Sequence, residues 1–204
     1  MNRQTALIKE SLWLALASLW CLAILALRME WAGKLMFLFL AWNLFLAWIP
    51  WIISAFAIPR FSWANPAKWV LGGVWLLFLP NAPYILTDLV HLRQRATIPF
   101  WLDLLLILSF AFTALMLGIA SLRHIWQEVK VIPRLRQLLL PAVCVLSAFG
   151  VYVGRYLRWN SWDVVTQPHT LLSDLLAWAY HPATLKEPLA FSLGFGMLLW
   201  LLFW

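Results

Sequence analysis

Six apolar stretches make up most of this chain. A helix needs about 20 mostly apolar residues to cross the hydrocarbon core of a bilayer. The stretches approach or exceed that length and cover residues 11–27, 35–58, 68–90, 98–121, 137–157 and 188–204. The sequence therefore predicts an all-α fold: a polytopic transmembrane helix bundle of about six helices, which forms a single integral membrane domain over residues 1–204.

The composition supports a membrane location. Hydrophobic residues account for 64% of the chain and charged residues for 11%, whereas soluble domains carry about 25% charged residues. The 15 Lys and Arg residues are scattered between the apolar stretches, and a nucleic-acid-binding surface would gather them on one face. The predicted partners are membrane lipids, and no nucleic acid is expected.

The first and last stretches each leave an alternative open. Residues 11–27 follow a short basic start and resemble a signal peptide, but no convincing small-residue cleavage site precedes Arg28. We therefore interpret this stretch as a helix. The sixth stretch is barely long enough to span a bilayer, so a half-inserted tail is the alternative to a full crossing.

Two further features describe how the bundle is built. Residues 158–187 mix polar residues with leucines at a spacing that favours an interfacial amphipathic helix, and Pro168 and Pro182 bracket it as helix-breaking residues. In the fifth stretch, Gly150 and Gly154 form a G-x-x-x-G spacing that would let another helix approach closely.

Orientation rests on the Lys and Arg residues outside the helices, because basic connections tend to stay cytoplasmic. One side of a six-helix topology carries eight of them: Arg3, Lys9, Arg60, Lys68, Arg123, Lys130, Arg134 and Arg136. The other side carries seven: Arg28, Lys34, Arg93, Arg95, Arg155, Arg158 and Lys186. The densest connection, residues 122–136, decides the near tie, and we expect a cell (plasma) membrane protein with both termini cytoplasmic.

The third stretch contains two prolines in the segment FLPNAPYILTDLVHL, residues 78–92. Pro80 and Pro83 lack an N–H and clash with the carbonyl four residues back, so Leu76 and Leu79 lose their normal helical partners. We therefore predict one Pro-interrupted helix. Interrupted helices form binding sites in transporters; a simple kink, with Asn81 satisfying a freed carbonyl, is the alternative.

Four polar residues follow the first proline at helical spacing. Asn81, Tyr84, Asp88 and His91 would project from one face of a continuing helix. Such a stripe is costly against lipid, so it should face protein or water. Asp88 and His91 are candidates to pair, to hold a metal ion or to exchange a proton, unless both are simply solvated at headgroup level.

An antiparallel arrangement brings further polar residues to the same end of the bundle. Asp103 lies near the start of the fourth stretch, Asn43 near the start of the second, and the run RYLRWNSWD ends the fifth. Arg155 and Arg158 would then offset the carboxylates of Asp88, Asp103 and Asp163 in a polar pocket, since buried charges need partners. The alternative is an ion-pair network that only joins helices.

Four sequence blocks together resemble a known family. They are WNLFLAWIP (42–50), the PNAPY-to-TD block within 78–92, DLLLILSFA (103–111) and GRYLRWNSWD (154–163). The chain is similar to a bacterial multipass membrane family catalogued as domain of unknown function thirteen sixty-one. The resemblance implies a compact prokaryotic inner-membrane protein whose hallmark residues are the polar ones named above. It identifies no substrate, and the cofactor, if any, stays unknown.

Three functions remain open at this point. The leading hypothesis is a pocket that binds or translocates a small polar or anionic species, with Arg155 and Arg158 as anion contacts. The second is an intramembrane enzyme acting on lipid or peptide, with Asp88, His91 and Asp103 as catalytic candidates and the first two as metal-ligand candidates. The third is a structural or assembly subunit. The predicted binding residues are Asn43, Asn81, Tyr84, Thr87, Asp88, His91, Asp103, Arg155, Arg158, Asn160 and Asp163.

Overall fold

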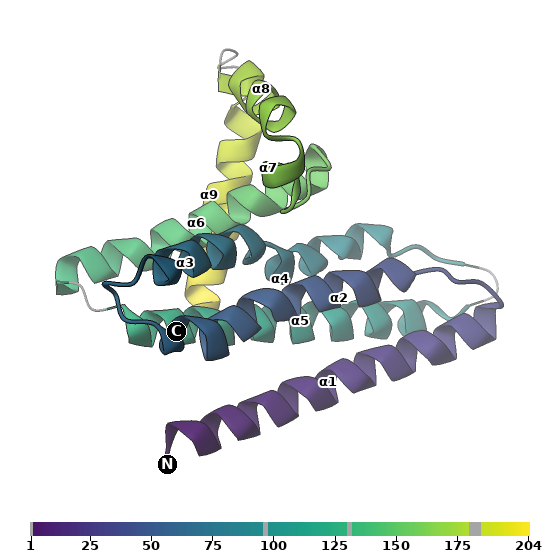
Figure 1. Cartoon of the computed structure of the whole chain (residues 1–204). Helices are drawn as coiled ribbons and strands as arrows, with labels where there is room; N and C mark the ends of the chain where they lie inside the picture. Colours follow the sequence, from purple (N-terminus) through teal and green to yellow (C-terminus); the bar gives the residue numbers. More distant parts are fainter. Residues whose placement is uncertain (1, 96–97, 130–131, 180–184) are drawn as a thin grey trace.

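The computed structural model describes residues 2–95, 98–129, 132–179 and 185–204, and it is built of helices (Figure 1). Six helical segments of the described residues are long and apolar enough to cross a membrane, which confirms the predicted multipass bundle. Their bounds are Arg3–Ala32, Leu38–Arg60, Pro66–His91, Phe100–Glu128, Arg134–Tyr156 and Lys186–Phe203.

The first helix, α1 (Arg3–Ala32), is longer than the apolar stretch that predicted it because both of its ends are capped. The side chain of Asn2 accepts a hydrogen bond from the backbone N–H of Gln4. At the other end Gly33 has a φ of 60°, in the left-handed region, and donates its N–H to the carbonyl of Glu30. The chain then turns back into α2 (Leu38–Ile52), which continues through a π-helical turn, η1 (Ile53–Ala57), and a 3₁₀ turn, η2 (Ile58–Arg60).

The third crossing is interrupted where its prolines predict. Helix α3 (Pro66–Phe78) ends before Pro80, a single turn follows as α4 (Asn81–Tyr84), and the chain then tightens into the 3₁₀ helix η3 (Ile85–His91). This confirms the Pro-interrupted helix.

Helix α5 (Phe100–Glu128) is the centre of the bundle, and its inward side chains are largely buried. Helices α1 and α2, the short α4 and the 3₁₀ helix η3 all pack against it. Because α5 runs to Glu128, His124 lies inside this helix. The prediction that residues 122–136 form a connection is therefore wrong for the part up to Glu128, which includes His124.

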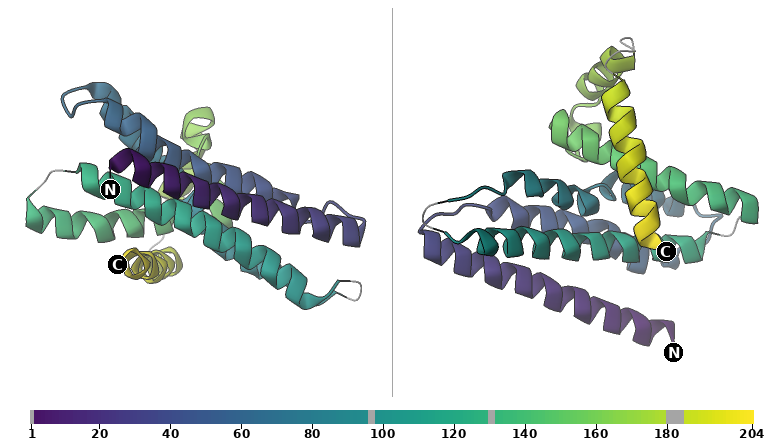
Figure 2. Two further views of the ribbon diagram at one scale, coloured as in Figure 1. Left: turned by 90° about the horizontal axis from the view of Figure 1, so that it is seen from below. Right: turned by 180° about the vertical axis from the view of Figure 1, so that it is seen from behind.

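Helices α6 (Pro133–Tyr156) and α9 (Lys186–Phe203) pack against each other. Helix α9 crosses the long helices steeply: it stands nearly upright in Figure 1 and is seen almost end-on in the left view of Figure 2, where α1 and α5 lie lengthwise. A Cβ atom at Gly196 would lie 2.7 Å from the Val145 Cα, so this glycine allows the two helices to approach closely.

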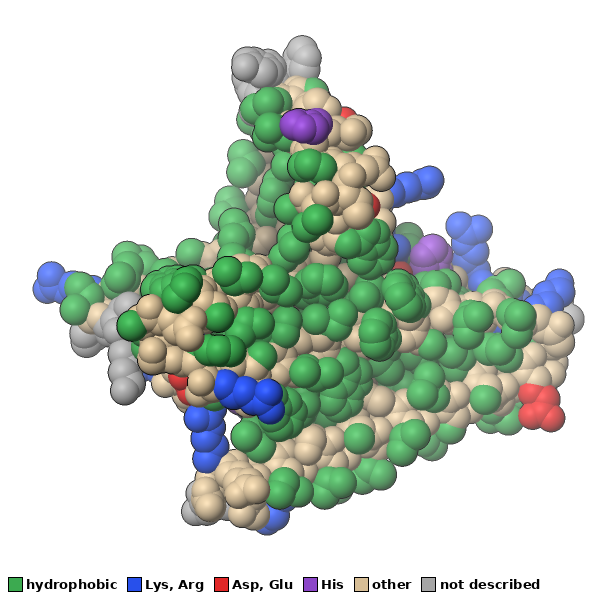
Figure 3. Space-filling view, viewed as in Figure 1, with side chains coloured by type: hydrophobic (Ala, Val, Ile, Leu, Met, Phe, Trp, Pro, Cys, Tyr) green, Lys and Arg blue, Asp and Glu red, His purple; other side chains and the backbone are tan. Residues whose placement is uncertain are grey.

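Two short helices connect α6 to α9 at the top of Figure 1, namely α7 (Asp163–Thr166) and α8 (Pro168–Ala179). Helix α8 begins at Pro168, as predicted, whereas Pro182 lies outside the described residues. Figure 3 shows apolar side chains over the middle of the long helices and Lys and Arg side chains toward their ends. This is the distribution expected of helices that cross a bilayer.

Candidate functional site

The break in the third crossing is held by two polar side chains. Asn81 Nδ2 donates to the Phe78 carbonyl and to Ser161 Oγ, both at 2.9 Å, and Ser161 Oγ donates to the Leu77 carbonyl at 3.0 Å. In an unbroken helix the backbone N–H groups of residues 81 and 82 would bond to these two carbonyls. Asn81 thus satisfies a freed carbonyl, and the segment after α6 is joined to the break.

The two glycines of α6 lie against this broken helix. A Cβ atom at Gly150 would lie 2.4 Å from Pro80 Cγ, and one at Gly154 would lie 3.4 Å from Tyr84 Cε2. A side chain at Gly150 would therefore collide with the proline ring. This confirms that the G-x-x-x-G spacing admits a close neighbour.

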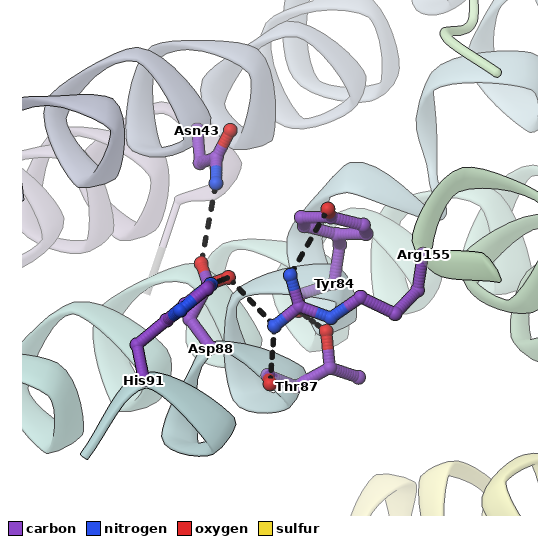
Figure 4. A network of polar contacts seen from close by, with 6 residues as sticks. All are labelled: Asn43, Tyr84, Thr87, Asp88, His91 and Arg155. Atoms are coloured by element: carbon purple, nitrogen blue, oxygen red, sulfur yellow. Dashed lines mark hydrogen bonds and ion pairs between the residues drawn. The ribbon is translucent and has the colours of Figure 1, made fainter. Parts of the chain in front are cut away.

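Asp88 is the centre of a polar network that joins three crossings (Figure 4). Its side chain is 1% exposed. Oδ1 lies 3.0 Å from Arg155 Nη2 on α6, and Oδ2 accepts from Asn43 Nδ2 on α2 at 3.2 Å. His91 Nε2 is 3.9 Å from Oδ1, and the His91 side chain is 46% exposed. The predicted convergence of these residues at one end of the bundle is confirmed.

Arg155 makes further contacts that leave it little freedom. Its guanidinium donates to the Tyr84 hydroxyl at 3.3 Å and to the Thr87 carbonyl, and it lies over the Tyr84 ring with 5.2 Å to the centroid. The charge of Arg155 is thus balanced by Asp88, and two more of its N–H groups donate to oxygen acceptors.

The partners predicted for Asp103 are wrong. Asp103 Oδ1 accepts from Arg28 Nε at 2.9 Å, and Oδ2 is bonded by Arg95 Nη1. Arg28 and Asp103 are each 1% exposed. The guanidiniums of Arg28 and Arg95 both lie over the Phe37 ring, at 4.8 and 5.2 Å. Asp103 therefore belongs to a separate ion-pair cluster that ties α1 to α5, because α1 ends at this side and supplies a cation of its own.

Asp163 also has partners other than the predicted arginines. Its Oδ2 accepts from the backbone N–H and the Nδ2 of Asn160, at 2.7 and 3.1 Å, and its Oδ1 accepts from the Thr166 hydroxyl at 3.2 Å. These bonds, the backbone N–H foremost, hold the pKa of the Asp163 carboxyl below its usual value. Arg158 is exposed, with a left-handed φ of 61°. Asp163 thus closes the turn before α7 and does not balance an arginine.

Within the described part of the chain, no group of three or more His, Cys, Asp or Glu side chains is arranged to hold a metal ion. Asp88 and His91 would supply two ligands, fewer than a structural or catalytic zinc site needs. Among these residues the candidate metal pair thus has no third His, Cys, Asp or Glu ligand.

A cavity of about 410 Å³ lies beside the Asp88 network. It is lined by α2, by the broken third crossing, by α6, and by the α7–α8 segment, which contributes Val164, Leu171 and Leu175. Its polar lining residues are Asn43, Asn81, Tyr84, Asn160 and Ser161. Its other lining residues are Trp42, Leu46, Gly73, Leu76, Leu77, Pro80, Leu146, Phe149, Gly150, Val153, Gly154, Trp159, Val164, Leu171 and Leu175.

The sequence did not reveal every residue of importance. Ser161 was visible only as one polar residue of the WNSWD run, and its role depends on a partner 80 positions away. At the opposite end of the bundle, Glu10 Oε1 accepts from Trp51 Nε1 at 2.7 Å and lies 3.1 Å from His124 Nε2. Glu10 precedes the predicted start of the first crossing, so no pattern linked it to α5.

Comparisons with known proteins give one match. A family model described as "Protein of unknown function (DUF1361)" matches residues 42–202. No curated protein and no solved structure shows significant similarity to the chain. The matched range contains Asn43, the broken crossing, Asp103 and Arg155, and therefore the cavity and its surroundings.

Proposed function

We propose that this chain, which belongs to the DUF1361 family of unknown function, binds an amphipathic molecule of the membrane in the cavity between α2, the broken crossing, α6 and α8. The apolar chain of the ligand lies against leucine, valine and aromatic side chains. Its polar group lies at the asparagines. The observation that carries this proposal is the lining itself, which is apolar over most of its surface and polar at Asn43, Asn81 and Asn160.

The size and chemistry of the cavity support a small ligand or part of a lipid. Small-molecule sites are mostly apolar, occupy roughly 300–1,000 Å³ and contain a few placed polar groups, and this cavity has about 410 Å³. It is lined by elements of three membrane crossings, so molecules dissolved in the bilayer lie beside it. Irregular backbone at membrane depth is tolerated where it borders a cavity, as the broken crossing does here.

The polar end of the site suits an uncharged or weakly polar group better than the anion first expected. Arg155 is not among the lining residues, and its guanidinium already faces Asp88 and two further oxygens. Arg158 is exposed outside the cavity lining. The geometry therefore gives more support to a ligand held by amides and hydroxyls.

A structural role of the ion pairs is the second candidate. Asp88–Arg155 and Asp103–Arg28 each join two crossings, and both carboxylates are buried. This observation favours helix association as their task, and an intramembrane enzyme that used Asp103 would have to release it from two arginines. Ligand binding in the cavity and structural ion pairs beside it are compatible.

The cellular setting is part of the proposal. We place the chain in the cell membrane of a bacterium with both termini cytoplasmic, on the support of the eight against seven count of Lys and Arg residues and the basic segment 122–136. A reporter that works only outside the cytoplasm should be active when it is fused after Arg95. A reporter that works only in the cytoplasm should be active when it is fused after Arg134. The reverse pattern would overturn this orientation.

Two adjacent glycines offer a matched test of binding. A Cβ atom at Gly72 or at Gly73 of α3 would have no neighbour within 4 Å, but only Gly73 lines the cavity. Protein held in amphipol is titrated with 1-octanoylglycerol while its thermal unfolding is followed, because a ligand of the folded state stabilises it in a saturable manner. Wild type and Gly72→Phe should be stabilised and Gly73→Phe should not. Equal stabilisation of all three would place binding elsewhere.

A further inference from the structure

We infer that the polar group received by this cavity is neutral and rich in hydroxyls, such as a sugar or a glycerol, and is not a phosphate or a carboxylate. The inference rests on the proposed function, because it describes the ligand of that same cavity. It comes from the hydrogen-bond state of the lining asparagines.

The orientation of each side-chain amide is fixed by a partner that can only accept. Asn43 faces the Asp88 carboxylate, Asn81 faces the Phe78 carbonyl, and Asn160 faces the Asp163 carboxylate. Neither a carboxylate nor a carbonyl donates a hydrogen bond, so the NH₂ group of each asparagine must point to it. Figure 4 shows the consequence at Asn43, whose oxygen lies on the side away from Asp88.

All three amide oxygens are therefore left as acceptors. Within the described ranges, no side chain or backbone N–H donates to Oδ1 of Asn43, Asn81 or Asn160, although all three residues line the cavity. Ser161 gives its only hydroxyl proton to the Leu77 carbonyl and thus cannot serve them. Asn43 and Asn81 are half-buried and Asn160 is exposed, so solvent reaches these residues. A ligand that displaces this solvent must bring donors, since an acceptor left unpaired beside an apolar ligand loses its hydrogen bond to water.

The same lining also offers hydrogen-bond donors. It therefore favours a ligand group that can both donate and accept, which is a hydroxyl. Tyr84 keeps its own hydroxyl proton, because its oxygen accepts from Arg155, and Asn43 and Asn160 each keep a second N–H. A hydroxyl both donates and accepts, so one polyol group can satisfy both kinds of atom. A carboxylate or a fully ionised phosphate accepts only, so it could bond to these donors but would leave the three amide oxygens without a partner.

Charge excludes ionic head groups independently. None of the described residues that line the cavity is Asp, Glu, Lys, Arg or His. The nearby Arg155 is balanced by Asp88 at 3.0 Å. An anion or an ammonium group would therefore enter a largely apolar cavity without a counter-charge, which is costly.

A series of amphiphiles that share one chain tests the inference. Wild-type protein in amphipol is titrated with octyl β-glucoside, 1-octanoylglycerol, octanoate, octyl phosphate and octylamine, and each Kd is obtained from thermal unfolding. The glucoside and the glycerol ester should bind at least about tenfold more tightly than the three ionic compounds. That factor corresponds to about 1.4 kcal/mol, the scale of one net hydrogen bond.

Two substitutions add a matched control. Asn160→Ala removes one amide. It should weaken the binding of octyl β-glucoside about tenfold and change the Kd of octanoate little. Leu175→Ala shortens an apolar side chain of the cavity lining and should weaken the binding of every compound by a similar factor. If Asn160→Ala fails to fold, Asn43→Ala serves the same purpose from α2.

The outcomes separate the two proposals. Equal affinity for all five heads, or tighter binding of octyl phosphate, octanoate or octylamine, overturns the inference and leaves the cavity as a lipid site. Absence of saturable binding by every compound overturns the proposed function itself. Preference for the hydroxylated heads that is lost in Asn160→Ala supports both.

Discussion

Arg155 Nη2 at the end of α6 lies 3.0 Å from Asp88 Oδ1 on η3. A cation and a carboxylate 67 positions apart thus join α6 to the third crossing. Asp88 is 1% exposed and the Arg155 side chain 17%. Because the pair sits beside the cavity and orients Tyr84, which lines it, its integrity sets the geometry of the polar end.

Removing one partner of the Asp88–Arg155 ion pair should lower the stability of the protein strongly. Asp88→Asn or Arg155→Met leaves a buried charge without its partner, and we expect each to lower the free energy of unfolding by about 3–5 kcal/mol. The double variant Asp88→Asn/Arg155→Met should cost less than the sum of the two. Equilibrium unfolding in detergent measures all three, and strictly additive losses would show that the two residues do not interact.

The contact between Gly150 and Pro80 predicts a contrast between two glycines. Gly150→Ala places a Cβ atom 2.4 Å from Pro80 Cγ and should destabilise the protein by roughly 1–3 kcal/mol, the usual cost of overpacking. Gly72→Ala meets nothing within 4 Å and should be neutral or stabilising by up to about 1 kcal/mol, since alanine favours a helix. Thermal unfolding compares them, and equal effects would argue against the close packing of α6 on the broken crossing.

The cluster around Asp103 predicts an order among arginines. The Arg28 side chain is 1% exposed, whereas that of Arg95 is 23% exposed. Arg28→Met should therefore reduce stability by more than Arg95→Met, because solvent near Arg95 screens its interaction with the carboxylate. The comparison uses the same unfolding assay. A larger loss for Arg95→Met would mean that α1 is not held to α5 through this pair.

Asp163 predicts a dependence on pH. Its pKa is lower in the folded protein than the reference value of about 3.9 for an unfolded chain. Its stabilising contribution is hence fully present above that reference value and is lost as the pH falls through the folded-state pKa. The difference in unfolding free energy between wild type and Asp163→Asn should shrink on going from pH 7 to pH 3. A difference that stays constant or grows would contradict the role of Asp163 in closing the turn before α7.

The sequence predicted the crossings and the break well because both follow from local rules. The apolar stretches mark the six helices, and Pro80 and Pro83 mark the interruption in the third. The family resemblance, carried mainly by the block 78–92, is confirmed by the match over residues 42–202. These features need no knowledge of how distant segments meet.

Side-chain partners were predictable only where alternatives were few. The serpentine order brought Arg155 to the same end as Asp88, and that pairing is confirmed. Asp103 had several cations at its end of the bundle, and the one at the end of α1, Arg28, was missed because nothing in the sequence fixes how α1 lies on α5. The apolar lining of the cavity could not be predicted either, since the contribution of Leu171 and Leu175 depends on where the α7–α8 segment folds back.

The most direct test of the central claim is to identify the lipids that stay bound to the protein when it is purified from its own membrane. Wild type, Gly72→Phe and Gly73→Phe are purified into amphipol in parallel, and the lipids retained by each are extracted and quantified by mass spectrometry. The account predicts a near-stoichiometric amphiphile with a neutral hydroxylated head in wild type and Gly72→Phe, and its loss in folded Gly73→Phe. The same lipids in the same amounts in all three proteins would contradict a ligand site in this cavity.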